Sequence, residues 1–220
     1  MKALIHLVPR SGTPGSFESR VREIAQGLRE SPDAQGAELN VMLRIKDDPF
    51  GRRTQIRAAI ELIDAEATAA SLANQLQGLD RRLEDLVHVD LSSLLVGEDV
   101  VFIACRKTPI RYQYLMRRNA SFSHESYLKR YRDVHSRFGI ETPGISGYTQ
   151  FHVDPEASRR AARSAGFGVW AVDSVSELHL ESVETFLAEV SQSSIGVEAL
   201  ADEEVFVDRA NSYDFVSRIE

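Results

Sequence analysis

The clearest pattern of apolar and polar positions lies in residues 123–153. Behind Ser123, a residue suited to capping a helix, apolar side chains recur every three or four residues until Gly139, which predicts a helix. After a Pro-Gly turn, residues 145–153 alternate strictly and predict a strand with one apolar face and one polar, aromatic face. We therefore expect function to centre on this helix and strand. The helical stripe comprises Tyr127, Leu128, Tyr131, Val134, His135 and Phe138.

The rest of the chain predicts the order β-α-β-β-α-β in each half, with one extra strand in the first half. In the first half we expect strands at 2–8, 38–45, 57–65 and 99–106, helices at 16–30 and 68–79, and extended structure at 87–90. In the second half we expect strands at 110–118, within 169–180, at 205–208 and at 213–219, and a helix at 182–190. Residues 154–168 predict only a helical turn and a loop.

Three short segments of the first half match segments of the second half in the same order. Residues 42–49 align with 148–155, Glu61-Leu62 with Glu177-Leu178, and 87–90 with 205–208. This order predicts an α+β fold of two tandem ferredoxin-like (βαββαβ) halves, 1–106 and 107–220. Strands that are apolar on both sides fit two halves that bury both faces of their sheets. Two halves packed in another way are the alternative arrangement.

The predicted helix and the strand after it resemble the EthD-like family, which belongs to the dimeric α+β barrel superfamily. The resemblance covers residues 110–220, and over residues 1–105 it is only architectural. It implies that the two halves form one barrel within the chain, with the helices outside. Tyr127 and Tyr131 stand where the family usually has Phe and Trp. The residues that carry the resemblance are Tyr127, Tyr131, His135, the Pro143-Gly144 turn, Tyr148, Gln150 and His152.

Composition and charge exclude several classes of function. The net charge of −7 argues against a nucleic-acid-binding protein, because phosphate contacts need clustered lysine and arginine. Cys105 is the only cysteine, so no intrachain disulfide is expected, and no spacing of cysteine and histidine suggests a metal site. The N-terminal apolar run is too short for a signal peptide, and no window reaches the roughly 20 apolar residues of a membrane helix. We expect a cytoplasmic protein with neither a membrane nor a nucleic-acid partner, and a homodimer of the fused barrel is compatible with the sequence.

The two halves differ in chemistry, and this difference places the predicted site in the second half. Val21 and Ala25 align with Tyr131 and His135, so the first half lacks the histidine and aromatic set and serves as a structural partner. Imidazole suits proton transfer because its unperturbed pKa is about 6.5, and a neighbouring carboxylate can fix its tautomer. We predict that His135 is the catalytic acid or base. If the two strands face one cavity, the residues expected to bind a substrate are Tyr114, Tyr131, Tyr148, Gln150, His152, Glu177 and His179.

Each candidate also has a structural interpretation. His135 would then be a buried histidine bonded to a backbone carbonyl, and His152 and His179 would lie in water at the barrel ends. Glu177 has a counterpart, Glu61, in the half without the histidines, which favours a structural role. A metal site made from the histidines and Glu177 would lack the short ligand spacing typical of such sites.

The resemblance implies a protein that handles small molecules, because relatives of the EthD-like family include lactone isomerases and polyketide-tailoring enzymes. The first hypothesis is an enzyme that performs acid/base chemistry without a cofactor, such as isomerisation, dehydration or cyclisation, on a hydrophobic oxygenated or aromatic substrate. The alternative is a non-catalytic metabolite-binding or accessory protein of an oxidative degradation pathway. A haem role, known elsewhere in the superfamily, ranks third because it needs an axial histidine over a wide cavity.

Overall fold

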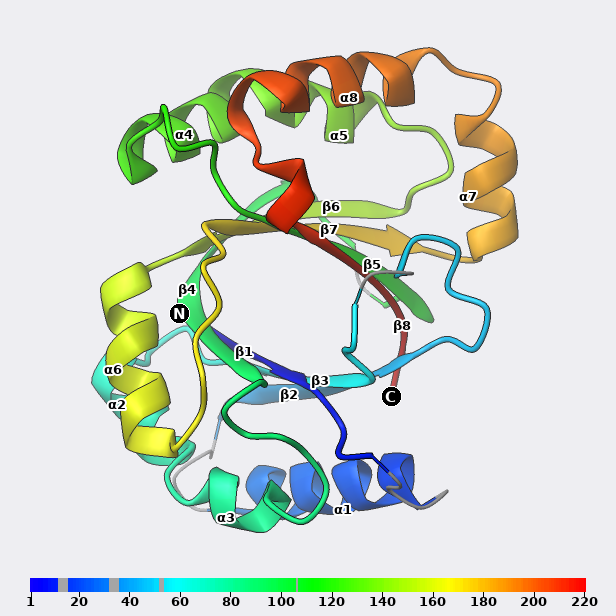
Figure 1. The fold of residues 1–220 in the computed structure, drawn as a ribbon. Helices are drawn as coiled ribbons and strands as arrows, with labels where there is room; N and C mark the ends of the chain where they lie inside the picture. Colours follow the sequence, from blue (N-terminus) through cyan, green and yellow to red (C-terminus); the bar gives the residue numbers. More distant parts are fainter. Residues whose placement is uncertain (12–15, 32–35, 52–53, 106) are drawn as a thin grey trace.

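The strands of the chain close into a barrel, and Figure 1 shows them around its interior, with β6 and β7 above and β1, β2 and β3 below. The computed structural model describes residues 1–11, 16–31, 36–51, 54–105 and 107–220. Within this part of the chain, eight antiparallel strands follow the order β1-β3-β2-β8-β5-β7-β6-β4. Closure leaves no free sheet edge. The strands are β1 (Lys2–Leu7), β2 (Glu38–Arg44), β3 (Ala58–Ile63), β4 (Ser93–Ile103), β5 (Ile110–Met116), β6 (Gly147–Val153), β7 (Ser174–Leu180) and β8 (Tyr213–Ile219).

The barrel consists of two sheets, each with the strand order of a ferredoxin-like unit. The first half supplies β4-β1-β3-β2, and the second half supplies β8-β5-β7-β6. The two sheets join where β2 pairs with β8 and where β4 pairs with β6. The predicted α+β fold, in which two tandem halves form one barrel within the chain, is confirmed. The boundary between residues 106 and 107 stays a prediction.

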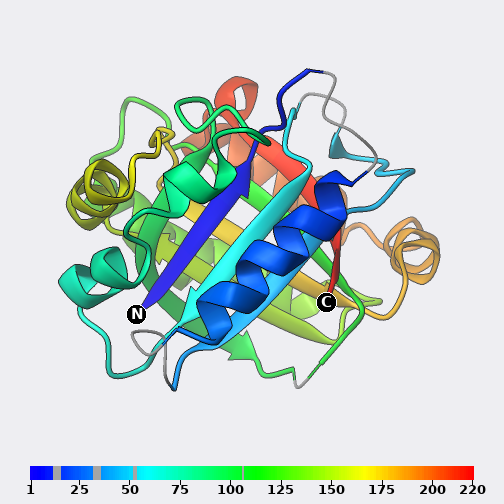
Figure 2. The ribbon, with the colours of Figure 1, turned by 90° about the horizontal axis from the view of Figure 1, so that it is seen from below.

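Helices cover the outside of both sheets (Figure 1). Figure 2 shows α1 lying over the strands of the first half and running roughly along them. Its buried side chains keep the expected helical spacing, because they face the sheet. The helices are α1 (Phe17–Arg29), α2 (Ala69–Gln75), α3 (Leu79–Leu83), α4 (His124–Arg130), the π-helical η3 (Tyr131–His135), α5 (Ser136–Glu141), α6 (Pro155–Ala165), α7 (Val183–Val190), α8 (Ile195–Phe206) and the short η4 (Arg209–Asn211).

Glu61 and Glu177 of the internal repeat occupy equal positions in the two sheets, whereas residues 42–49 and 148–155 do not. Met42 pairs with Ala59 and Phe151 pairs with Val175, so Met42 corresponds to Phe151 and not to Tyr148. Glu61 lies opposite Leu4 in the pairing of β1 with β3, and Glu177 lies opposite Gln113 in the pairing of β5 with β7. The third pair of segments forms equivalent bridges, Pro9 with Val87 and Arg118 with Val207, so Val87 corresponds to Val207, two residues beyond its partner in the sequence alignment. The tandem relation of the halves is therefore visible in the register as well as in the strand order.

Several boundaries differ from the sequence-based expectation. Only single bridges occur where extended structure was expected at 87–90 and 205–208. Residues 205 and 206 end α8 instead, because the Phe206 ring is fully buried against Tyr127 and Tyr131, and this packing overrides strand propensity. β4 begins at Ser93, six residues before the expected start at 99. The helix expected at 68–79 is divided into α2 and α3 at Gly78, which has φ +76°.

The segment after β6 is a full helix, α6, instead of a helical turn. The Asp154 carboxylate accepts hydrogen bonds from the backbone N–H groups of Glu156 and Ala157, each at 2.9 Å, and Gly166 ends the helix in the left-handed conformation. Its alanine face packs into the core beneath the first-half helices, beside α2 (Figure 1). In exchange, Phe50 between β2 and β3 stacks on Tyr112 of the second half, with ring centroids 4.9 Å apart. In each half, the segment that connects the second strand to the third therefore packs into the core of the other half.

Candidate functional site

The predicted catalytic helix is interrupted by a π-helical turn that ends at His135. Ser123 caps its first turn, since its Oγ accepts a hydrogen bond from the Ser126 N–H. Such wide turns occur frequently at functional sites. Tyr131 and His135 face the sheet here, whereas Val134, expected in the apolar stripe, is 43% exposed because the wide turn changes the spacing.

Gly139 does not end this helix, which continues to Glu141. A Cβ atom at residue 139 would lie only 2.3 Å from Cε1 of the Tyr148 ring. Glycine is needed here because the ring lies directly against the helix, which brings strand β6 and helix α5 close together.

His135 is held by two acidic residues of α8. Its Nδ1 lies 2.9 Å from Oδ2 of Asp202, whose other oxygen accepts a hydrogen bond from Arg130. Its Nε2 lies 3.9 Å from Oε1 of Glu203. Burial lowers the pKa of His135 and outweighs the opposite effect of Asp202, so the ring is neutral near pH 7. Burial raises the pKa of Glu203 to about 7. The imidazole thus faces a carboxyl group that titrates near neutrality.

The polar face of β6 forms a hydrogen-bonded row beneath the same helix. Gln150 is fully buried, and its Nε2 donates to the Tyr148 hydroxyl at 2.7 Å and to the Tyr131 carbonyl at 3.0 Å. Its Oε1 lies 3.0 Å from Nε2 of His152. The Tyr131 ring is 5.8 Å from both the His135 and the His152 rings. Burial lowers the pKa of His152 to about 4, so it too is neutral near pH 7.

Tyr114 faces the same layer from β5. It packs against the apolar cluster that contains Tyr131 and Phe206. Burial, followed by the charge of Glu203, raises the pKa of its hydroxyl. The structure therefore brings together Tyr114, Tyr131, His135, Tyr148, Gln150 and His152. We call this group, with Asp202 and Glu203, the helix-layer site.

Glu177 and His179 do not belong to the helix-layer site, because they lie on the other face of the sheet. Glu177 pairs directly with Thr149, and His179 pairs with Gly147, and residues opposite each other on antiparallel strands point to the same side. That side is the barrel interior. The single cavity expected to join them with Tyr148 and His152 is therefore not formed, and the sheet separates the two groups.

Inside the barrel, Glu177 belongs to a buried cluster of charges. The Lys2 ammonium lies 2.8 Å from a Glu61 oxygen and 2.7 Å from a Glu177 oxygen, and the Arg111 guanidinium is 3.5 Å and 3.2 Å from the same two carboxylates. Lys2 and Arg111 occupy equal positions in the two halves, as do Glu61 and Glu177. Asp99, 3.2 Å from Lys2, adds a third carboxylate to this balanced set. We call these residues the lumen cluster.

A cavity of about 870 Å³ opens beside the lumen cluster at this end of the barrel. His179 lines it, and burial lowers the pKa of His179 to about 4. Among the described residues, no group of three or more His, Cys, Asp or Glu side chains is arranged to hold a metal ion. In the same part of the chain, no helix has both the length and the apolar composition needed to cross a membrane.

Residues 119–210 match the family model of the EthD domain. The match lies within the second half, which we call the EthD domain. The resemblance that Tyr127, His135 and the polar strand suggested is thereby confirmed. The matched residues include His135, Asp202 and Glu203, together with the whole polar face of β6. No curated protein is similar enough to the chain to count as a match.

Solved structures with the same barrel cover the whole chain. An anthrone oxidase-like protein aligns with a TM-score of 0.68 and 10% identity, over 100% of this chain and 90% of that one. A chlorite dismutase from Candidatus Nitrospira defluvii aligns with a TM-score of 0.59 and 12% identity, again over 100% of this chain and 90% of the other. At these identities the likeness shows the fold alone, and it extends the dimeric α+β barrel to the first half, which the EthD match does not reach.

The EthD domain differs from the first half in what it buries beneath its helices. In the first half this layer is one cluster made almost entirely of aliphatic side chains, and it includes Ala25, which the sequence aligned with His135. In the EthD domain the apolar side chains form two smaller, aromatic clusters, and His135, Gln150 and Glu203 are buried in the same layer. The expected difference in chemistry between the halves is thus present in the packing.

Sequence reasoning missed Asp202 and Glu203, the two partners of His135. They lie on α8, within residues 195–206 where no helix was expected. The available signal was the acidic run before Val205 and Phe206, in which Asp202 and Phe206 are four residues apart and so share a helix face. Because residues 205–208 were expected to form a strand, this helical spacing was not recognised.

Proposed function

We propose that the EthD domain catalyses proton transfer on a small hydrophobic molecule, without a cofactor, at the helix-layer site. The observation that supports this most is the buried arrangement of His135 between Asp202 and Glu203, in the half that matches the EthD family. Two titratable groups with shifted pKa values in contact with aromatic walls are typical of acid/base sites. The first half, which has aliphatic side chains in this layer, completes the barrel.

In this proposal Asp202 accepts the Nδ1–H of His135 and so leaves Nε2 unprotonated and able to take a proton from a substrate. Asp202 is a positioning residue, because it contacts Nδ1 of His135 and not Nε2, the nitrogen that takes the proton. Glu203, protonated below about pH 7, is the group that donates a proton on the same side. A base and an acid 3.9 Å apart suit isomerisation, dehydration or cyclisation, in which one proton leaves and another arrives.

The rings packed around His135 indicate the class of substrate. The His135 ring has Phe206 at 5.1 Å, Phe138 at 5.2 Å and Tyr131 at 5.8 Å between ring centroids. Aromatic surroundings with a few polar groups favour flat molecules with one or two oxygens. Tyr148 and His152 would orient those oxygens by hydrogen bonds, and Gln150, which is bonded to both, would hold them in place. The name of the anthrone oxidase-like neighbour agrees with this class of compound.

A ligand screen tests the proposal across the whole substrate class. Lactones, quinones and polyketide-like phenols are added to the wild-type protein and to His135→Gln, and the unfolding temperature is measured. A ligand at a hundred times its dissociation constant stabilises by about 2.7 kcal/mol, enough for a clear shift. We expect at least one compound to stabilise the wild type more than the variant, and to be converted. Binding without conversion would favour the non-catalytic alternative, and no hit in any class would contradict the substrate class.

The pH dependence of turnover tests the roles of the two groups separately. His135 must be neutral to act as base, so turnover should rise with pH through a pKa below 6.5. Glu203 must be protonated to act as acid, so turnover should fall as the pH passes about 7. The expected profile is a bell, and Glu203→Gln should remove its alkaline limb. An alkaline limb that persists in Glu203→Gln would exclude Glu203 as the acid.

A further inference from the structure

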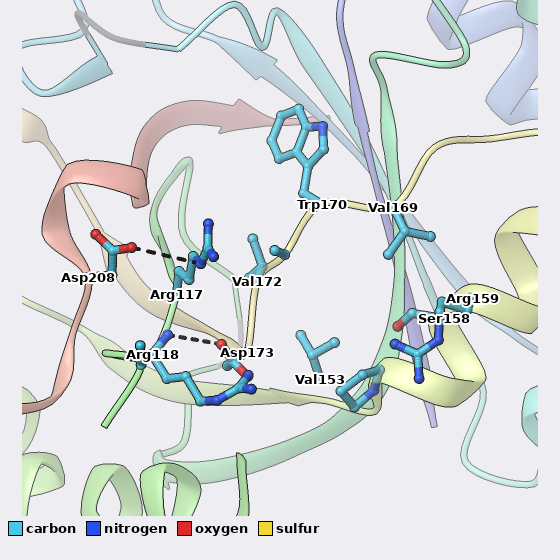
Figure 3. A pocket seen from close by; sticks show the side chains of 13 residues that line it. Arg117, Arg118, Val153, Ser158, Arg159, Val169, Trp170, Val172, Asp173 and Asp208 are labelled. Atoms are coloured by element: carbon cyan, nitrogen blue, oxygen red, sulfur yellow. Dashed lines mark hydrogen bonds and ion pairs between the residues drawn. The ribbon is translucent and has the colours of Figure 1, made fainter. Parts of the chain in front are cut away.

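A second cavity, of about 580 Å³, is shown in Figure 3, and it lies at the end of the barrel opposite the lumen cluster. It is found beyond the last residues of β5 and the first of β7, whereas the lumen cluster lies at their other ends. It includes no residue of the helix-layer site. Its side chains come from the end of β5, from α6 and from the segment that joins α6 to β7. Figure 3 shows Arg117, Arg118, Arg159, Trp170, Val172 and Asp173 around the hollow.

Positive charge dominates the lining of this cavity. Arg118 is fixed, because its guanidinium lies 2.6 Å from the buried Asp173 and donates to the Phe122 carbonyl at 3.0 Å. Arg117 is 3.8 Å from Asp208, which is too long for a good hydrogen bond. Arg159 makes no ion pair with any residue that the structure describes. Two guanidinium groups thus keep much of their hydrogen-bonding capacity for a ligand.

The remainder of the lining is apolar. Val153 and Val172 are buried, and they belong to the core of the barrel interior. Trp170 lies beside them, and its Nε1 donates to the Leu91 carbonyl at 3.0 Å. Because that donor is already used, the indole offers a ligand only apolar contact. One side of the cavity therefore suits an anion, and the other suits a hydrocarbon body.

We propose that this cavity binds an organic carboxylate, with its head group at Arg117 and Arg159 and its apolar body against Trp170 and the two valines. Guanidinium groups match the planar geometry of a carboxylate and can bind it through two parallel hydrogen bonds. Arg118, held by Asp173, adds positive charge at a fixed position. The site exists only because α6 brings Arg159 to the end of the barrel. The proposal does not depend on the helix-layer chemistry.

Tryptophan fluorescence tests this proposal directly, since Trp170 is the only tryptophan of the chain. Phenylacetate, phenylbutyrate and decanoate are titrated, with phenylacetamide and decanamide as neutral counterparts and inorganic phosphate as an anion without an apolar body. We expect a saturable change with at least one carboxylate and much weaker binding of its amide. Arg159→Ala should raise the dissociation constant about tenfold, as the loss of a charged hydrogen bond predicts.

Arg160→Ala is the matched control, because it removes the same charge from the next position of α6. Arg160 is 3.8 Å from Glu156, it is largely exposed, and it does not line the cavity. Unchanged affinity in Arg160→Ala, together with the loss in Arg159→Ala, supports the site. Equal losses in both variants, equal binding of the amides, equal binding of phosphate alone, or no saturable change with any of the carboxylates would each overturn it.

Discussion

Replacing Lys2 by methionine should lower the free energy of unfolding by about 3–5 kcal/mol, the range found when one partner of a buried ion pair is removed. Lys2 is 1% exposed, and its ammonium contacts Glu61, Glu177 and Asp99. Without it, three carboxylates in the barrel interior share the single charge of Arg111. Methionine keeps the length of the side chain, so the loss measures charge rather than packing. Urea unfolding followed by circular dichroism gives the value.

The pH dependence of this effect identifies its cause. Burial acts to raise the pKa of Glu61, but Lys2 and Arg111 outweigh it and hold that pKa at about 2. The stability from Glu61 is therefore present above its ordinary pKa and is lost as the pH falls toward 2. Burial raises the pKa of Asp99 to about 6, so its contribution is present at low pH and is lost as the pH rises through 6. Lys2→Met should therefore cost more near pH 8 than near pH 5, where carboxylates can take up protons.

Two further variants separate this explanation from a general effect of lost charge. Lys129→Met removes an exposed lysine 2.8 Å from Asp133, and an ion pair exposed to water contributes little to stability. Adding Asp99→Asn to Lys2→Met should recover part of the loss, because one uncompensated carboxylate is removed. A loss in Lys2→Met no larger than that in Lys129→Met would contradict the role assigned to the lumen cluster.

The second large effect concerns activity. With a substrate from the ligand screen, His135→Ala should lower kcat/KM by about 10²–10⁴-fold, the contribution typical of a positioned acid or base. His135→Gln keeps most of the volume and should lose a similar amount, which separates chemistry from packing. Asp202→Asn should lose less, since Asp202 orients the ring without touching the substrate. Steady-state kinetics gives the values, and circular dichroism shows whether each variant is folded.

His88→Ala is the control for this series, because His88 lies outside both the helix-layer site and the lumen cluster. Its turnover should equal that of the wild type. Full turnover in a folded His135→Ala variant would remove His135 from the mechanism. The helix-layer site would then be a packed polar core, and the non-catalytic alternative would gain support.

Much of the fold could be predicted from the sequence because local patterns determine it. The alternation in residues 145–153 and the helical stripe around Tyr131 depend only on neighbouring positions, and the repeat that includes Glu61 and Glu177 supplied the symmetry. Both carboxylates do occupy equal positions in the two sheets. Most single helices and strands were therefore accessible. The exceptions are α6, for which only a helical turn was expected, and α8, where acidic and apolar residues have no clear period.

The composition of the site was less accessible, because it depends on register and on distant contacts. The face on which Glu177 lies follows from its pairing with Thr149, and no local pattern contains that information. Lys2 looks like an ordinary N-terminal residue until β1, β3 and β7 surround it with carboxylates. The π-helical turn that moves Val134 outward likewise has no signature in the spacing of apolar residues.

The exchange of α6 and Phe50 between the halves has a consequence for how this protein can change over time. Deletion of either half would remove a piece of the other half's interior as well as one sheet of the barrel. A half that carries none of the proposed chemistry is therefore retained by selection for the integrity of its neighbour. Its surface residues are free to drift, while the side chains that receive the alanines of α6 and the aromatic contacts of Phe50 are constrained together.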